Sequence, residues 1–171
     1  MYEENNFLEF DGVLNTEYNQ NLLMYHGKSW KDKYGAFFDP ETVAELKRIV
    51  EKTNADIVIE SSWKYLGLEA MQQMWSDRNM PGKVIDVTPS SATDNMLLNA
   101  NLDEKNPAHT QWKGVEIASW IADNLQDEGR YVIIDDEYVI QDSQLPHFIL
   151  TNPYDGITAD LANRAIKILN G

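Results

Sequence analysis

The sequence contains no cysteine, so the chain has neither disulfide bonds nor thiolate metal ligands. It also lacks any apolar run close to the roughly 20 residues that a membrane-spanning helix needs. Residues 1–6 are acidic and polar, without the basic start and apolar stretch of a signal peptide. Together these absences predict a cytoplasmic protein with no membrane partner.

Basic residues are scarce. Lys and Arg number 14 against 28 Asp and Glu, and the formal net charge is −14. No basic block of the nucleic-acid-binding type is present, and a chain with this balance is repelled by a phosphate backbone. We therefore expect no extended nucleic-acid binding. The surplus of carboxylates favours a divalent cation only weakly, because most of these groups must be solvated surface.

The 171 residues are 43% hydrophobic and 25% charged, which is typical of one soluble domain spanning 1–171. Five short apolar runs predict buried strands at 7–10, 57–59, 84–87, 131–134 and 148–150. Helices are expected after Asp39, after Ser62, over 114–125 and after Thr158. Strands that alternate with helices and are continuously apolar predict an α/β fold, a three-layer Rossmann-like parallel sheet with helices on both faces.

Two segments fit neither a strand nor a helix. Residues 13–38 are irregular and rich in aromatic residues, and they predict a flap or small cap after the first strand rather than a helix. The flap either contacts substrate through Tyr25, His26, Lys28 and Trp30 or forms a small satellite core, which we slightly favour. Residues 90–111 form a polar loop without a recognisable specificity signature.

Polar residues follow three of the predicted strands, at the edge where ligands bind in parallel sheets. They are Glu9 and Asp11, Ser61 and Ser62, and Asp135 and Asp136. Taken singly, such residues are often helix caps or solvated turns. Carboxylates from two strand ends that face one crevice form a site for Mg²⁺, which prefers oxygen ligands and uses substrate phosphate for the rest. Their joint occurrence, each directly after a strand, therefore predicts a metal and phosphate site.

These motifs resemble those of the haloacid dehalogenase (HAD) superfamily of phosphohydrolases. FLEFDGVLN at 7–15 is similar to its first motif, IVIESSWK at 57–64 to its second and IIDD at 133–136 to its fourth. The Ser-Ser-Trp form and TNPYDGIT at 151–158 further resemble HAD-like domains of "Swiss army knife" RNA repair proteins and small stand-alone relatives. The resemblance covers nearly the whole chain.

The resemblance implies a role for each matching residue. Asp11 would be the general acid/base, with its backbone carbonyl on Mg²⁺, and Ser61 would bind the transferring phosphoryl group. The metal ligands would be Glu9, Asp11, Asp135 and Asp136. The third motif is a Lys or Arg that stabilises phosphoryl charge. Lys113 is its best match, although Lys64 could serve instead, and Lys113 could equally be a solvated lysine near a helix start.

The chain departs from the family pattern at Glu9, where the nucleophilic aspartate is expected. Glutamate is longer by one methylene, which moves the reacting oxygen by roughly 1 Å unless the side chain folds back. A misplacement of about 1 Å can cost on the order of 100-fold in rate. The resemblance thus implies a Mg²⁺-dependent phosphatase for a small phosphomonoester or a nucleic-acid phosphate end, impaired to the extent that Glu9 misplaces the reacting oxygen. The alternative is a non-catalytic phosphate- or metal-binding or regulatory module, and Glu9 fits either natural divergence or a deliberate exchange.

Overall fold

The computed structural model describes residues 4–90, 112–125 and 129–171. Its centre is a five-stranded parallel sheet with the strand order β3-β2-β1-β4-β5. The strands are β1 (Glu4–Leu8), β2 (Asp56–Ile59), β3 (Val84–Val87), β4 (Arg130–Asp135) and β5 (Phe148–Leu150). All five strands predicted from apolar runs are therefore present. The polar loop expected at 90–111 lies, apart from Ser90, outside the described residues.

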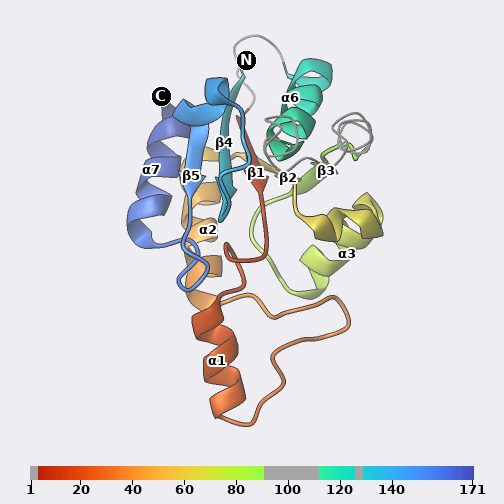
Figure 1. The fold of residues 1–171 in the computed structure, drawn as a ribbon, viewed down its shortest axis with the longest axis vertical. Helices are drawn as coiled ribbons and strands as arrows, with labels where there is room; N and C mark the ends of the chain where they lie inside the picture. Colours follow the sequence, from red (N-terminus) through yellow and green to blue (C-terminus); the bar gives the residue numbers. More distant parts are fainter. Residues whose placement is uncertain (1–3, 91–111, 126–128) are drawn as a thin grey trace, which may run out of the picture.

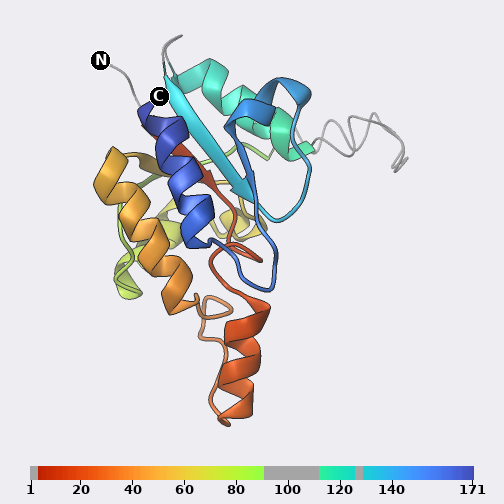
Figure 2. The same ribbon diagram turned by 90° about the vertical axis from the view of Figure 1, so that its left-hand side faces the viewer.

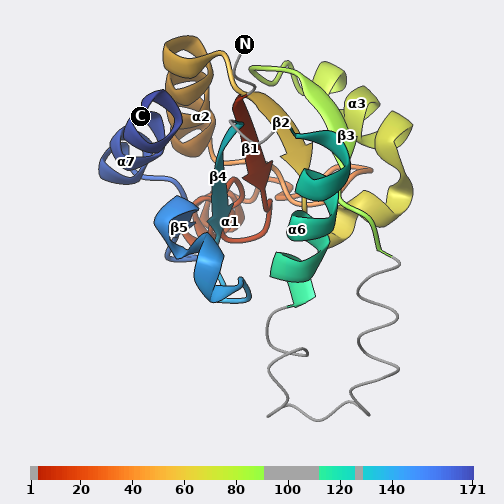
Figure 3. The same ribbon diagram turned by 90° about the horizontal axis from the view of Figure 1, so that it is seen from above.

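Helices cover both faces of the sheet, which makes the fold a three-layer Rossmann-like arrangement. α2 (Pro40–Thr53) and α7 (Ala159–Asn170) lie side by side on one face, and α6 (Trp112–Asn124) lies on the other (Figure 3). α3 (Leu68–Asp77) packs beside β3, and the short 3₁₀ helices are η1 (Ser62–Leu66) and η2 (Asp142–His147). No helix among the described residues is long and apolar enough to cross a bilayer.

The side chains of the central strands alternate between two cores. Leu8 and Ile134 point into the core shared with α2 and α7. Phe7 and Ile133, their neighbours along the chain, point into the core under α6. Because successive strand residues face opposite sides, the residues two positions after Phe7 and Ile133 also face α6. This alternation decides which strand-end side chains can meet.

The flap at 13–38 contains a helix, α1 (Glu17–Tyr25), so the expectation of a helix-free flap was wrong. Thr16 caps α1, and its hydroxyl accepts a hydrogen bond from the Asn19 N–H at 3.0 Å. The helix leaves the body on the side of the carboxyl ends of the strands (Figures 1 and 2). Leu22, Met24 and Tyr25 are exposed on it. Because α1 buries no apolar stripe, the sequence carries no helical periodicity to reveal it.

The end of the flap packs on the main body. The guanidinium of Arg78 donates to the Asp32 carboxylate at 2.6 Å and to the Gly35 carbonyl at 3.0 Å. Phe38 belongs to the core shared with α2 and α7, where its ring stacks on that of Trp63 with centroids 5.8 Å apart. A separate satellite core was therefore the wrong expectation, because these aromatic rings extend the main core. Trp63 itself is partly buried and packs against the same core.

Candidate metal and phosphate site

Three buried carboxyls stand at the ends of the three central strands. Asp135 is the last residue of β4, while Glu9 and Glu60 directly follow β1 and β2. The Glu9 N–H donates to the Ile134 carbonyl at 3.1 Å and the Glu60 N–H to the Leu8 carbonyl at 3.0 Å, which extends the sheet ladder to these residues. All three side chains face α6, because the residues two positions earlier point into the core under that helix: Phe7, Val58 and Ile133. The sequence placed Glu9 and Asp135 at this edge but assigned no role to Glu60.

Lys113, in the first turn of α6, lies against all three carboxyls. Its ammonium donates to Glu9 Oε2 and, at 2.8 Å, to Asp135 Oδ2, and it lies 3.7 Å from Glu60 Oε2. The residue is only 5% exposed. Burial lowers the pKa of Lys113, but the attraction of Glu60, Asp135 and Glu9 outweighs it and holds that pKa well above its usual value. Lys113 is therefore a buried, charged partner of the strand-end carboxyls.

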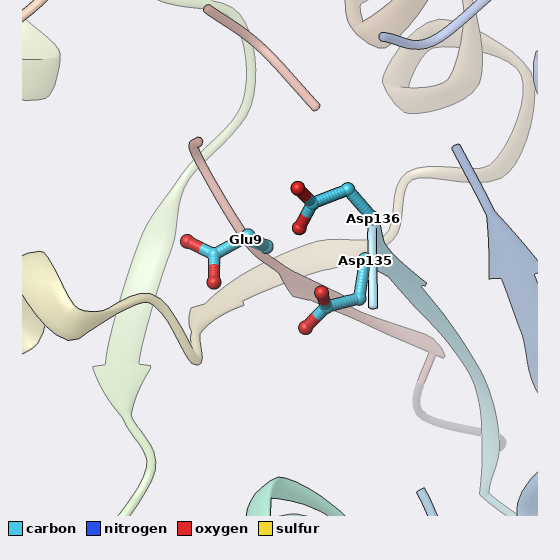
Figure 4. A group of neighbouring side chains, drawn as sticks. All are labelled: Glu9, Asp135 and Asp136. Carbon is cyan, nitrogen blue, oxygen red and sulfur yellow. The ribbon is translucent and has the colours of Figure 1, made fainter. Parts of the chain in front are cut away.

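Glu9, Asp135 and Asp136 form a compact acidic group. Each offers one carboxylate oxygen, and these oxygens lie within 4.8 Å of one another (Figure 4). Such a set of hard oxygen ligands fits Mg²⁺, which typically takes one or two carboxylates and keeps several waters. Gly12 leaves room for the group, because a Cβ at this position (φ +76°) would lie 2.5 Å from Asp136 Oδ2. A glycine at position 12 is thus needed for steric reasons.

Three carboxyls at this edge, those of Glu9, Glu60 and Asp136, have raised pKa values. Burial raises the pKa of Glu9, against the opposing effects of Lys113 and a hydrogen bond from Ser61. Burial also raises the pKa of Glu60 well above its usual range. Burial, a hydrogen bond with Asp135 and the Asp135 charge together raise the pKa of Asp136 to about 7. The positive charge near these carboxyls is therefore too small to keep all of them ionised, and a bound divalent cation would supply more.

The extra methylene of Glu9 is taken up by folding the side chain back. Glu9 Oε1 accepts a hydrogen bond of 2.8 Å from the N–H of the next residue, Phe10. Glu9 Oε2 is bound by the Lys113 ammonium. The fold-back keeps the carboxyl close to its own backbone, which is the conformation that offsets the greater length of glutamate. Both oxygens of the nucleophile position consequently have a donor.

Three other residues predicted from the sequence do not belong to the acidic group itself. Ser61 is fully buried, and its Oγ accepts from the Trp63 N–H at 3.3 Å, so it also caps η1. The Asp11 carboxylate is exposed and accepts from Asn15 Nδ2 at 2.9 Å. Its general acid/base role and its backbone contact with Mg²⁺ stay predictions. Lys64 points elsewhere, because its ammonium donates to Glu116 Oε2 at 2.7 Å and to Thr88 Oγ1 at 3.0 Å.

The segment after β5 supports the loop that carries Asp11 and Gly12. The Thr151 hydroxyl donates to the Gly12 carbonyl at 2.7 Å, and the Ile157 N–H donates to the Val13 carbonyl at 3.1 Å. A Cβ on Gly156 (φ +65°) would lie 2.4 Å from that same Val13 carbonyl oxygen. The TNPYDGIT motif therefore holds the first motif in place. This supporting role was not predicted from the sequence.

Comparison with known families identifies the family of the chain. A family model described as the HAD domain in Swiss Army Knife RNA repair proteins matches residues 7–162, which include every residue of the site. No curated protein and no solved structure gives a significant match. The chain belongs to the family of HAD domains found in Swiss Army Knife RNA repair proteins.

Proposed function

We propose that the protein is a Mg²⁺-dependent phosphatase for phosphomonoesters. The observation that carries the proposal is the acidic group of Glu9, Asp135 and Asp136 at the carboxyl edge of the sheet, with the Lys113 ammonium bound to two of its members. Carboxylates beside a fixed cation form the arrangement that phosphoryl transfer needs, because its catalysis rests on positioning and charge neutralisation. A cytoplasmic location stays a prediction from the sequence.

Glu9, Asp135 and Asp136 would hold the metal, with the Asp11 backbone carbonyl as a further ligand. Bound Mg²⁺ would neutralise charge on the phosphate oxygens. Lys113 would stabilise the same charge from the α6 side. Glu9 would attack phosphorus, the bond to the leaving oxygen would break, and that oxygen would take a proton from the exposed carboxyl of Asp11. Water, deprotonated by Asp11, would then attack phosphorus, the bond between phosphorus and the Glu9 oxygen would break, and phosphate would leave with the Glu9 carboxylate restored.

The contacts of Glu9 set an expectation for the rate. One of its oxygens is bound by Lys113 and the other by the Phe10 N–H, so attack requires that one of these bonds be given up. We therefore expect a slow enzyme. The same observation favours a second candidate function, a non-catalytic module that binds phosphate or metal at this edge without turnover.

Two substrate classes fit the site, small phosphorylated molecules and the phosphate end of a nucleic acid. The family description names RNA repair proteins, which supports a nucleic-acid end. The net charge of −14 disfavours extended contact with a phosphate backbone, so recognition would be confined to the terminal phosphate.

The test is hydrolysis of a broad phosphomonoester panel, including 3′- and 5′-phosphorylated oligonucleotides, with Mg²⁺ or with EDTA. We expect slow, EDTA-sensitive hydrolysis by the parent chain and faster hydrolysis by Glu9→Asp, because aspartate restores the expected reach of the nucleophile. Asp135→Ala should lose the part of the hydrolysis that depends on Mg²⁺. The control Asp123→Ala, at an exposed position, should keep it. The enzyme proposal is abandoned if neither the parent nor Glu9→Asp turns over any substrate. Anion binding without turnover would then identify the binding module.

A further inference from the structure

Glu60 breaks the usual rule for buried polar groups. Its side chain is 1% exposed, and no group in the described part of the chain donates a hydrogen bond to either carboxyl oxygen. Its ion contact is with the Lys113 ammonium, 3.7 Å from Oε2. Burying a carboxyl without hydrogen bonds is unfavourable, and such groups in native proteins are uncommon enough to need an explanation. The position of Glu60 beside the proposed phosphate-binding lysine suggests a functional one.

The strand order shows what Glu60 adds to the geometry. The neighbouring strands β2, β1 and β4 carry one of these carboxyls each at their carboxyl ends, in the order Glu60, Glu9 and Asp135. Glu9 therefore lies in the middle. Without Glu60, the acceptors of Lys113 would lie only over β1 and β4, and the ammonium could shift toward β4. The Glu60 carboxyl adds an ion contact of 3.7 Å on the β2 side. Two hydrogen-bond acceptors and this ion contact, from three strands, restrict the ammonium more than the two acceptors can alone.

We propose that Glu60 is a positioning residue, which holds the Lys113 ammonium over β1 so that it faces Glu9 and a phosphate bound there. The catalytic consequence rests on the proposed phosphatase function, while the positioning itself does not. A carboxyl oxygen carries partial negative charge toward the ammonium whether or not the group is protonated, so the role requires the oxygen rather than the full charge. Glutamine keeps that oxygen, and methionine removes it at similar length.

Three variants separate positioning from a structural role. Glu60→Met removes both side-chain oxygens, and Glu60→Gln keeps one of them. Glu116→Gln is the matched control. Glu116 is equally buried, pairs with Lys64 instead and also has one oxygen without a partner among the described residues. We expect Glu60→Met to raise Tm by about 2–4 °C, because it removes an unsatisfied buried carboxyl. A fall in Tm, including failure to fold, would indicate a structural role and overturn the proposal.

Activity is measured with p-nitrophenyl phosphate and Mg²⁺, in the parent or in Glu9→Asp, whichever turns over faster. Glu60→Met should lower kcat by about 10- to 100-fold with a smaller change in KM, because the lysine acts on transition-state charge. Glu60→Gln should recover much of this loss, and Glu116→Gln should leave kcat unchanged. A Glu60→Met kcat within about twofold of its reference overturns the proposal.

A second readout does not depend on activity. The ¹⁵Nζ signal of Lys113, assigned by its loss in Lys113→Met, reports the surroundings of the ammonium. It should shift in Glu60→Met, return toward the parent value in Glu60→Gln and stay in place in Glu116→Gln. An unchanged signal in Glu60→Met refutes the positioning role. If no background shows turnover, the phosphatase proposal fails and this signal alone decides the role of Glu60.

Discussion

Replacing Lys113 by Met should destabilise the fold strongly and in a pH-dependent way. Methionine keeps most of the length of the side chain but removes the ammonium bound to Glu9 and Asp135 and 3.7 Å from Glu60. Removing one partner of a buried ion pair costs about 3–5 kcal/mol. Because Lys113 is 5% exposed and serves three carboxyls, we expect the upper half of that range at pH 8. This corresponds to a Tm lower by roughly 10 °C.

The sign of the pH dependence follows from the raised pKa values of Glu9 and Glu60. A carboxyl whose pKa is raised in the folded state gives stability that is present below its unfolded pKa and is lost as pH rises through its folded pKa. Loss of the lysine raises these pKa values further, so the penalty is largest at alkaline pH. The difference between Lys113→Met and the parent should therefore shrink as pH falls from 8 toward 5.5, because falling pH favours the protonated carboxyls.

Urea denaturation at pH 8 and pH 5.5 measures both the size and the slope of this effect. Lys47→Met is the control, because its side chain is 65% exposed and lies 3.9 Å from an equally exposed Glu51. That change should alter the free energy of unfolding by less than about 0.5 kcal/mol. A destabilisation by Lys113→Met below about 1 kcal/mol at pH 8 would refute the reasoning, because that value is far below the cost of breaking a buried ion pair. A penalty that is the same at both pH values would also refute it.

Three further perturbations test other parts of the site and flap. Asp136→Asn should raise the free energy of unfolding at pH 8 by about 1 kcal/mol, because it removes a charge that the folded state disfavours: the Asp136 carboxyl has a pKa of about 7. The effect is limited by partial solvation of the group and should be small at pH 5, which urea titrations at the two pH values measure. Gly12→Ala should cost about 1–2 kcal/mol, because φ is +76°, and should weaken Mg²⁺ binding in calorimetry by displacing Asp136. Arg78→Gln should free the flap from its contacts with Asp32 and Gly35, which speeds chymotryptic cleavage within 13–38 but leaves Mg²⁺ affinity unchanged.

The sequence determined the sheet and most of its helices. Buried parallel strands are short, continuously apolar runs, so all five could be located before the structure was known. α2 and α7 could be located because Asp39 and Thr158 cap them and each buries one face. α1 could not, because it projects from the body and exposes residues such as Tyr25, which leaves no periodic signal.

The sequence also determined which carboxylates could share a site, because parallel strands place their carboxyl ends at one edge. Tertiary packing decided the rest. The sequence favoured Lys113 but left Lys64 as an alternative, and only the placement of α6 puts the Lys113 ammonium against Glu9 and the Lys64 ammonium against Glu116. Strand alternation turns Glu60 toward α6, but its lack of a hydrogen-bond partner within the described residues depends on everything packed around it. Contacts between residues this far apart in the chain leave no local pattern, because they arise only when separate elements meet.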